Sequence, residues 1–466
     1  MIKKTKIIAT IGPSSWDKKI LKEMIHNGLN VARINASFAN HAELRRVSKK
    51  IHKLSDSIAI MMDTKGHKIR ISNFSKPIKL KNKSSFSLYT QKVKSGVYLV
   101  TESNLNLEKQ IPIGTTILID DGLIKLKVKN IKDKKLVCKV IQGGFLTKSK
   151  TVNIPGVHIE FPDLSKKDYE DILFAKKANF DFIAASFIRN VNDVKAIKNL
   201  IDGSNTKLIA KIEDREGVEN FEDILKEVDG IMIARGDLGV EILAEKVPTL
   251  QKEFIEKCNE LGKPVIVATQ MLQSMTNNIT PTRAEVNDVA NAIYDGADAV
   301  MLSAETSTGK YPIKAVSVMN RIALSIENSI QSVDRKHSPL AKPTTNAIAK
   351  AVIDSCYSLP IDKILVATAT GTTAKTIVRF RPKQPVFAFT KDNYSKRKLA
   401  LSRGIVSDIL SKSSLTRDRG VKIIVQTAKD KGYVSNSDLV IVVAGANIMG
   451  QRGTNMLEIN RVEQII

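Results

Sequence analysis

The stretch GIMIARGDLG (residues 230–239) is a short apolar run that closes with charged residues and glycines. Seven further runs of this kind occur in the first two-thirds of the chain, separated by segments with helical patterning. They are KIIATIG (6–12), NVARINAS (30–37), AIMMDTKG (59–66), FIAASF (182–187), KLIAKIE (207–213), PVIVATQ (264–270) and AVMLSAE (299–305). Aliphatic strands that alternate with helices predict a parallel sheet, and eight such units are enough to close a (β/α)8 TIM barrel.

The carboxyl ends of the strands in such a barrel face one shared mouth. Here these ends carry cationic, acidic and hydroxyl side chains together, which favours a catalytic face that handles an anion and a cation. The residues are Arg33, Asn35, Asp63, Lys65, Lys211, Glu213, Asp237, Thr269, Ser303 and Glu305.

The barrel pattern is interrupted once and then ends. Between Arg70 and about Pro155, short β-like pieces alternate with turns, which predicts a small all-β domain inserted after the third strand. After about Lys336 a new alternation begins, with helices predicted at 346–357, near Tyr394 and from Thr416, and strands at 363–370, 386–390 and 439–445. We therefore expect a barrel (1–70 and 156–335), an inserted β lid (71–155) and a C-terminal α/β domain (336–466). A lid at the mouth can exclude water from a substrate.

The amino-acid composition and net charge indicate which class of protein this chain belongs to. With 466 residues, 42% of them hydrophobic and 26% charged, the chain is ordinary for a globular protein with two or three domains. The three cysteines lie far apart without CxxC spacing, and no run is long enough to cross a bilayer, so we expect a cytoplasmic protein without a membrane partner. The net charge of +25 permits nucleic-acid binding, but scattered lysines and 5% aromatic residues favour a lysine-rich surface without a specific nucleic-acid partner.

Glu213 and Asp237 end two neighbouring predicted strands and can hold one divalent ion while leaving room for substrate oxygens, as Mg²⁺ prefers. Lys211 lies two residues before Glu213 and points to the same side of the barrel. The alternative is a structural ion-pair ring in which Lys211 and Arg235 neutralise the two acids. The glycine-rich turn after Arg235 predicts exposed N–H groups of Gly236 and Asp237 that can receive an anion.

Hydroxyl groups at the rim suggest two further sites. Thr269, Ser303 and Glu305 can relay a proton, with buried and satisfied hydroxyls as the alternative. Ser37, Asp63 and Thr64 form an oxygen cluster suited to a cation. The six histidines show no paired spacing, so zinc is not expected, and residues 371–376 lack the glycine that a P-loop needs before its lysine.

In this order, the strand ends resemble those of the pyruvate kinases, over essentially the whole chain. The segments that carry the resemblance are ATIGPSS (9–15), NVARINAS (30–37), DTKG (63–66), IDDGLI (119–124), VNIPG (152–156), AKIEDREGV (210–218), IMIARGDLGVEI (231–242), KPVIVATQML (263–272), PTRAEVNDVANAIYDGADAVMLSAET (281–306) and GTN (453–455). The resemblance implies a barrel, a β lid and a regulatory α/β domain in a homotetramer. It implies transfer of phosphate from phosphoenolpyruvate to ADP, which makes pyruvate and ATP in the last step of glycolysis.

The resemblance also implies roles for individual residues. Glu213 and Asp237 would bind Mg²⁺ or Mn²⁺, and Lys211 would neutralise the moving phosphoryl group and the enolate oxygen. Arg33 and Arg70 would hold phosphate, and Thr269 with the N–H groups of Gly236 and Asp237 would bind the carboxylate. The remaining sets are proton delivery by Thr269, Ser303 and Glu305, a monovalent-cation site of Asn35, Ser37, Asp63 and Thr64, and nucleotide binding by Asn35, Arg70 and Lys150.

Some positions depart from the family pattern. The usual DTKGPEIR is here DTKGHKIR, with His67 and Lys68. In the family, lysine at the second of these positions goes with independence from K⁺, since a tethered ammonium can replace the ion. We therefore expect activity without K⁺, while the retained oxygen ligands keep K⁺ binding open. Phe38-Ala39 replaces His-Gly, Thr151 replaces glycine before VNIPG, and Ala304 replaces glycine, which affects binding more than chemistry.

Two other functions remain as alternatives. One is another barrel that handles phosphoenolpyruvate, such as a mutase, a lyase or a dikinase domain, although the predicted lid and C-terminal domain argue against it. The other is a basic scaffold or nucleic-acid-binding protein, which rests on net charge alone. The hydroxyl-rich loop TATGTTA (368–374) can hold the phosphate of an effector, but it does not name the effector, and insensitivity to effectors is also open.

Overall fold

The structure is a computed structural model that describes residues 2–72, 74–101, 105–330, 343–410, 417–445 and 453–466. Its centre is a closed barrel of eight strands in the order β1-β17-β16-β15-β14-β13-β3-β2. Every neighbouring pair in this barrel is parallel. The strands are β1 (Lys6–Thr10), β2 (Val31–Asn35), β3 (Ala59–Asp63), β13 (Phe182–Ala185), β14 (Lys207–Ile212), β15 (Gly230–Ala234), β16 (Val265–Ala268) and β17 (Ala299–Leu302). The predicted TIM barrel is confirmed, and each of the eight apolar runs contains one of its strands.

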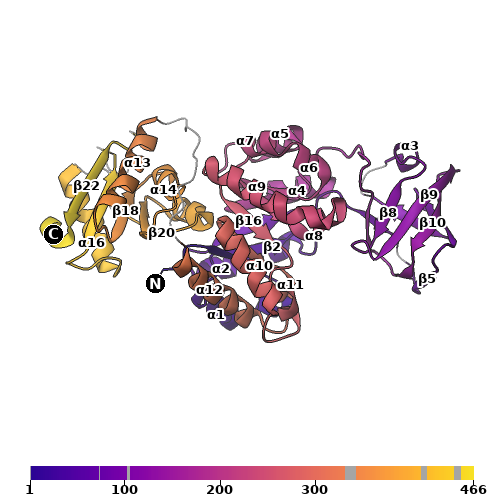
Figure 1. The fold of residues 1–466 in the computed structure, drawn as a ribbon, viewed down its shortest axis with the longest axis horizontal. Helices are drawn as coiled ribbons and strands as arrows, with labels where there is room; N and C mark the ends of the chain where they lie inside the picture. The colour runs from indigo at the N-terminus through magenta and orange to yellow at the C-terminus, as the bar shows by residue number, and fades with distance from the viewer. Residues whose placement is uncertain (1, 73, 102–104, 331–342, 411–416, 446–452) are drawn as a thin grey trace.

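Helices surround the barrel (Figure 1). Side-chain caps start several of them: Asn40 Oδ1 accepts the N–H of Glu43, and Ser165 Oγ accepts that of Asp168. The helices are α1 (Lys18–His26), α2 (His41–Leu54), α4 (Lys166–Lys177), α5 (Val191–Ile201), α6 (Arg215–Glu219), α7 (Phe221–Glu227), α8 (Arg235–Glu241), α9 (Val247–Glu260), α10 (Arg283–Asp295), α11 (Ala304–Ser307) and α12 (Pro312–Ser329), with 3₁₀ turns at Pro13–Ser15, Ala244–Lys246 and Gln273–Thr276.

Side chains fill the inside of the barrel, so it is a packed core with its chemistry at one end. Alternate residues of the strands, such as Ile8, Met61, Ile209 and Met232, form this inner core and are fully buried. The intervening residues, such as Ile7 and Ile60, pack outward against the helices in a second, larger core. Both faces of every strand are therefore buried, which explains why the strands read as nearly continuous apolar runs.

A β-rich insert follows β3. It contains a second closed barrel in the order β10-β6-β7-β4-β12-β8-β9, a two-stranded sheet of β11 and β5, and its own apolar core. Its elements are β4 (Ile69–Ile71), β5 (Ile78–Leu80), β6 (Ser85–Tyr89), β7 (Val97–Val100), α3 (Leu107–Gln110), β8 (Thr116–Ile119), β9 (Ile124–Lys132), β10 (Lys135–Gln142), β11 (Gly144–Leu146) and β12 (Thr151–Asn153). The short helix α3 is an addition to the predicted all-β pattern.

The C-terminal part is a five-stranded sheet in the order β20-β19-β18-β21-β22, with one apolar core on each face. All its strand pairs are parallel except that of β22 with β21. The strands are β18 (Lys363–Ala367), β19 (Val386–Thr390), β20 (Ile405–Ile409), β21 (Leu439–Ala444) and β22 (Met456–Arg461); the helices are α13 (Pro343–Ser358), α14 (Thr372–Val378), α15 (Asn393–Lys398), α16 (Arg417–Asp430) and α17 (Val462–Ile465), with a 3₁₀ turn at Leu399–Leu401. The sequence pattern did not predict β20, β22 or α17. The expected start of a helix at Thr416 lies outside the described residues.

The insert and the C-terminal part lie on opposite sides of the barrel (Figure 1). The insert therefore stands at the end of the barrel where β3 finishes, and the C-terminal sheet is remote from that mouth. The predicted domain boundaries at 70/71, 155/156 and 335/336 stay predictions, and the last of them falls outside the described residues. Among the described helices, none combines the length and the apolar character that crossing a bilayer requires.

Candidate active site

Three barrel strands bring Arg33, Asp63 and Lys211 together at the mouth. Arg33 Nε lies 2.8 Å from one carboxylate oxygen of Asp63, and Lys211 Nζ lies 3.0 Å from the other. All three side chains are buried. Burial alone would raise the pKa of Asp63, but Arg33 and Lys211 outweigh it and hold this pKa below its usual value. Asp63 is therefore an anionic brace that fixes two cations at the mouth.

Lys211 remains protonated although it is buried. Burial lowers the pKa of its ammonium, but the charges of Asp63 and Glu213 outweigh this and raise the pKa above the ordinary lysine value. Its Nζ lies 3.1 Å from Glu213 Oε1 and donates to Ser186 Oγ at 2.6 Å. The cation is thus held by three groups from three strand ends, in one defined place.

The negative charge of Glu213 is only partly compensated. Burial, with a further contribution from Asp237, raises its pKa to about 7 despite the opposing charge of Lys211. Its Oε2 accepts the N–H of Phe187 at 2.8 Å, whereas its buried Oε1 accepts no hydrogen bond within the part of the chain that the structure describes. A buried oxygen that accepts no hydrogen bond, beside a second carboxylate, is the donor set that a divalent cation would complete.

Asp237 lies in the first turn of α8, directly after β15. Its Oδ1 lies 2.9 Å from Lys68 Nζ, and the charges of Lys68 and Lys211 outweigh burial and lower its pKa. The described residues contain no cluster of three or more His, Cys, Asp or Glu side chains with metal-site geometry. Glu213 and Asp237 would therefore supply two protein ligands and leave the rest to substrate and water, which suits Mg²⁺.

The alternative in which Arg235 neutralises this acid pair is not what the structure shows. Arg235 donates to both oxygens of Asp288 at 2.6 Å and to the carbonyl of Thr269 at 2.8 Å. The other ion pair of that alternative is present, because Lys211 contacts Glu213. The arginine instead ties the start of α8 to α10.

The N–H groups predicted to receive an anion lie at the same turn, but that of Gly236 already has a partner within the protein, and the Thr269 hydroxyl donates to the Ala268 carbonyl at 2.6 Å. The N–H of Gly236 donates to Thr269 Oγ1 at 2.8 Å. Thr269 and the residue after it have left-handed backbone conformations, with φ of 68° and 54°. A β-branched residue rarely adopts this conformation, so local strain places the Thr269 hydroxyl against the turn.

Glu305 and Ser303 lie at the end of β17. Glu305 is buried, and its oxygens accept the N–H of Ser303 at 2.7 Å and that of Leu272 at 3.2 Å. Its carboxylate therefore braces two loops at the mouth. Ser303 Oγ is buried and has no hydrogen-bond partner among the described residues.

The predicted monovalent-cation residues are close in the chain but already have partners. Asn35 Oδ1 accepts the N–H of Ser37 at 2.9 Å, and Thr64 Oγ1 accepts that of Ser186 at 3.0 Å. Both oxygens of Asp63 contact protein cations, as described above.

Arg70 and Lys150, expected at the nucleotide, lie on neighbouring segments of the insert. Arg70 Nη1 donates to the Ser149 carbonyl at 2.9 Å, and Lys150 Nζ lies 2.8 Å from Asp120 Oδ1. The N–H of Ile71 donates to the Lys150 carbonyl at 2.8 Å. Both cations thus contact groups of the insert, so any contact with a substrate at Lys211 depends on the position of the insert.

Sequence reasoning missed two hydroxyl groups of the site. Ser186 Oγ accepts from Lys211 and donates to the Thr64 carbonyl at 2.8 Å. Thr10 Oγ1 accepts Arg33 Nη1 at 2.7 Å. A signal was present, because each hydroxyl follows or ends an apolar run, as Thr269 and Ser303 do.

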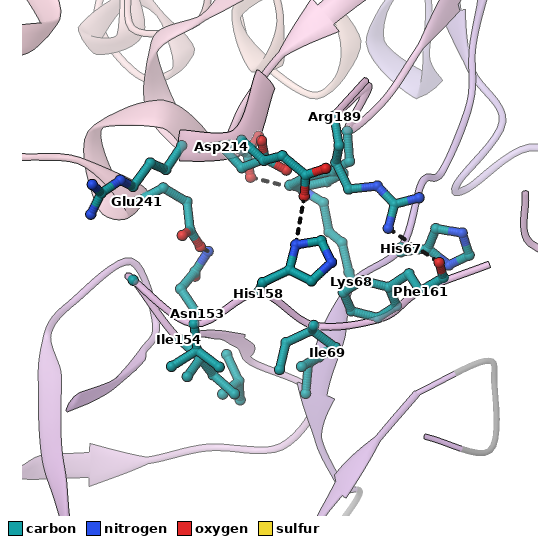
Figure 2. Close-up of a pocket in the computed structure, with 18 of the residues that line it drawn as sticks. His67, Lys68, Ile69, Asn153, Ile154, His158, Phe161, Arg189, Asp214 and Glu241 are labelled. Atoms are coloured by element: carbon teal, nitrogen blue, oxygen red, sulfur yellow. Dashed lines mark hydrogen bonds and ion pairs between the residues drawn. The ribbon is translucent and has the colours of Figure 1, made fainter. Parts of the chain in front are cut away.

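A cavity of about 400 Å³ separates the insert from the barrel beside this site. Its wall includes Lys68 and Asp237, with further residues from β4, β12, the linkers of the insert, the loop after β13, and helices α6 and α8 (Figure 2). The cavity adjoins the proposed metal ligands on the side of the insert.

Family models and individual relatives among known proteins match this chain and name the same family. The family models for the pyruvate kinase barrel domain and the pyruvate kinase alpha/beta domain match residues 2–316 and 346–460. Similar proteins include the pyruvate kinase of Clostridium acetobutylicum, 41% identical over 475 residues (99% of this chain and 100% of that protein). The pyruvate kinase of Geobacillus stearothermophilus is 40% identical over 480 residues, which cover 100% of this chain and 81% of that protein. The pyruvate kinase of Staphylococcus aureus strain MRSA252 is 41% identical over 477 residues, which cover 99% of this chain and 81% of that protein.

Proposed function

Because the chain belongs to the pyruvate kinase family, it transfers phosphate from phosphoenolpyruvate to ADP, and we propose that Lys211, Glu213 and Asp237 carry this reaction. The observation that carries the proposal is the buried Lys211 ammonium, 3.1 Å from a carboxylate oxygen that accepts no hydrogen bond within the described residues. A fixed cation and a place for a second one thus lie side by side. Phosphoryl transfer needs positioned positive charge more than covalent chemistry.

In the reaction, the bond from phosphorus to the enol oxygen of phosphoenolpyruvate breaks, and a bond from phosphorus to a β-phosphate oxygen of ADP forms. Lys211 neutralises charge on the moving group and on the enolate oxygen it leaves. Arg33, held by Asp63 and Thr10, binds the phosphate together with Arg70 of the insert. The enolate carbon then takes a proton, which gives pyruvate.

The carboxylate of phosphoenolpyruvate binds at the start of α8. Thr269 Oγ1 and the N–H groups of Gly236 and Asp237 are the proposed partners, and the carboxylate would replace the present bond between the Gly236 N–H and Thr269 Oγ1. Proton delivery uses the same rim. The Ser303 hydroxyl, without a partner among the described residues, supports a place for Ser303 on that route, with Thr269 beside it and Glu305 bracing the loop.

Pyruvate kinases generally need a divalent metal ion and K⁺. Here we assign Mg²⁺, or Mn²⁺, to Glu213 and Asp237; when bound, the ion supplies positive charge to the phosphoryl oxygens. Asn35, Ser37, Asp63 and Thr64 are the proposed monovalent-cation residues, and Lys68 makes added K⁺ unnecessary. Asn35, Arg70 and Lys150 are the proposed nucleotide contacts.

Further assignments follow the family. We propose a cytoplasmic homotetramer with a barrel at 1–70 and 156–335, a lid at 71–155 and a regulatory domain at 336–466. An effector with a phosphate group would use the loop at 368–374.

The test combines turnover with metal binding. Pyruvate formation from phosphoenolpyruvate and ADP is measured by a coupled lactate dehydrogenase assay, and Mn²⁺ binding is measured by electron paramagnetic resonance. Wild type is expected to form pyruvate, while Glu213→Gln and Asp237→Asn bind Mn²⁺ weakly and lose turnover. A crystal grown with magnesium and oxalate that placed the ion away from both acids would overturn the metal assignment.

A further inference from the structure

We propose that Glu241 is a positioning residue that couples the insert to Asp237 through its hydrogen bond with Asn153. The proposal rests on the function proposed for Asp237. Asn153 is the last residue of β12, the strand by which the chain leaves the insert. Its Nδ2 donates to Glu241 Oε1 at 2.6 Å, which is a short contact between two half-buried side chains (Figure 2).

Glu241 is well placed to move Asp237, because both belong to α8. Asp237 lies in the first turn of this helix and Glu241 is its last residue. Residues four apart lie on the same face of a helix, one turn from each other. A shift of the insert that pulls on Glu241 would therefore move the turn that carries Asp237 and the N–H of Gly236.

The polar contacts of this helix on the side of the insert include those of Asp237 with Lys68 and of Glu241 with Asn153. Of its side chains, Leu238 is buried, and Gly236 and Gly239 add no side-chain bulk. Arg235 pins the start of the helix to Asp288, and the Asn153 hydrogen bond holds its end. The cavity of about 400 Å³ lies between α8 and the insert, and Asn153, Glu241, Lys68 and Asp237 all line it.

Two other polar contacts join the same linker to the barrel without touching α8. His158 Nδ1 lies 2.9 Å from Glu216 Oε2, on α6. Arg189 donates to the carbonyls of Phe161 and Pro162 at 3.3 Å, from the loop after β13. They anchor the linker, whereas Asn153 connects the insert to the helix of the metal ligand. His158 therefore offers a matched control: a polar side chain on the wall of the same cavity with a different barrel partner.

The positions of two contacts with α8 favour a role for the bond between Asn153 and Glu241 beyond local stability. Lys68, in the linker that enters the insert, contacts Asp237 directly, and Asn153, at the exit, contacts Glu241. Both ends of the insert thus reach one seven-residue helix at two points one turn apart. Closure of the insert over a substrate would set the Asp237 carboxylate, in addition to excluding water.

The experiment compares Asn153→Ala and Glu241→Ala with Glu241→Gln and with the control His158→Gln, in the full chain. Glutamine keeps an oxygen that can accept from Asn153, so Glu241→Gln should resemble wild type. The two alanine variants should raise the Mn²⁺ dissociation constant, measured by electron paramagnetic resonance with phosphoenolpyruvate present, by about tenfold, as expected for one lost hydrogen bond. They should also lower kcat more than they raise the KM for phosphoenolpyruvate. His158→Gln should change each value by less than about twofold.

Two outcomes would overturn the proposal. One is wild-type Mn²⁺ affinity and kcat in both alanine variants. Another is a purely structural effect, in which the melting temperature falls while the Mn²⁺ dissociation constant stays unchanged. If Glu241→Ala does not fold, Asn153→Ala and Glu241→Gln still decide. A different result would show that the function proposed for Asp237 is itself wrong: Asp237→Asn would then keep normal Mn²⁺ binding and turnover.

Discussion

Lys68 Nζ lies 2.9 Å from Asp237 Oδ1, so the linker into the insert supplies a cation to the mouth of the barrel. The same ammonium lies 5.0 Å from the centre of the Phe187 ring, whose face attracts a cation. Lys68 is the first of the charges that outweigh burial and lower the pKa of Asp237. The site thus holds a tethered cation next to one of its two acids.

The tethered charge of Lys68 predicts that turnover does not need K⁺, although its ion pair is with Asp237 and the proposed monovalent-cation residues are Asn35, Ser37, Asp63 and Thr64. Wild type should form pyruvate at full rate in a sodium-free buffer with an organic cation. Lys68→Gln removes the charge and should lower turnover roughly tenfold or more without K⁺, with recovery when K⁺ is added. Lys68→Arg keeps a cation and serves as the control. A strong K⁺ requirement in wild type would contradict the prediction.

Lys211→Met should lose roughly 10²-fold or more in kcat, because it removes a positioned charge from the phosphoryl group. Methionine fills a similar volume, and Asp63 keeps its ion pair with Arg33, so the variant should fold. The coupled assay measures turnover, and circular dichroism checks the fold. Near-normal turnover would exclude this lysine from the mechanism.

Gly66 should not tolerate a side chain. Its φ is +68°, and a Cβ would lie 2.7 Å from Phe187 Cδ2 and from Ser186 Cβ. Gly66→Ala should therefore destabilise the fold by about 1–3 kcal/mol and displace the hydroxyl that holds Lys211, lowering kcat.

Gly203 provides the matched control, because its φ is +69° and nothing lies within 4 Å of the place that a Cβ would take. Gly203→Ala should show only the backbone penalty in urea unfolding and keep wild-type kcat. Equal losses in both variants would show that the contact with Ser186 and Phe187 is unimportant.

Thr269→Ala should weaken binding of phosphoenolpyruvate by about tenfold, because it removes the hydroxyl next to the Gly236 N–H. Thr269→Ser keeps that hydroxyl and should stay close to wild type. The measurement is the KM for phosphoenolpyruvate at saturating ADP. An unchanged KM in the alanine variant would place the carboxylate elsewhere.

His52 should make the fold sensitive to acid. Burial and then the charge of Arg397 lower its pKa from 6.5 to about 4, so the folded protein binds fewer protons than the unfolded chain between these values. Its contribution to stability is present above about pH 6.5 and is lost as the pH falls toward 4. His52→Gln should flatten the pH dependence of unfolding in this window.

Most of the barrel could be predicted because every strand is buried on both faces and each ends in a polar residue or is directly followed by one. Charged candidates for the site could be proposed for the same reason, since Arg33, Lys211 and Asp237 stand out at the ends of apolar runs. Ser186 and Thr10 were missed because a hydroxyl after an apolar run resembles an ordinary strand end. Their roles depend on Lys211 and Arg33, which come from other strands.

Pairing between distant segments could not be predicted. Arg235 finds Asp288 on α10 rather than the nearby acids, and Lys68 reaches Asp237 across the mouth. The strands β20 and β22 were missed because they are largely half-buried, so their polar residues hide the apolar pattern. The contacts of Arg235 and Lys68 depend on which side chains barrel closure brings together, and the local pattern of each strand does not encode those pairs.

The two linkers of the insert run side by side, since His67 of the first stacks on Phe161 of the second with 5.0 Å between ring centres. The insert also has an apolar core of its own, separate from those of the barrel. A chain that leaves and returns at neighbouring points imposes little loop-closure entropy on the strands around it. The barrel and the insert can therefore acquire their native packing in either order, and stepwise melting would reveal two cooperative units.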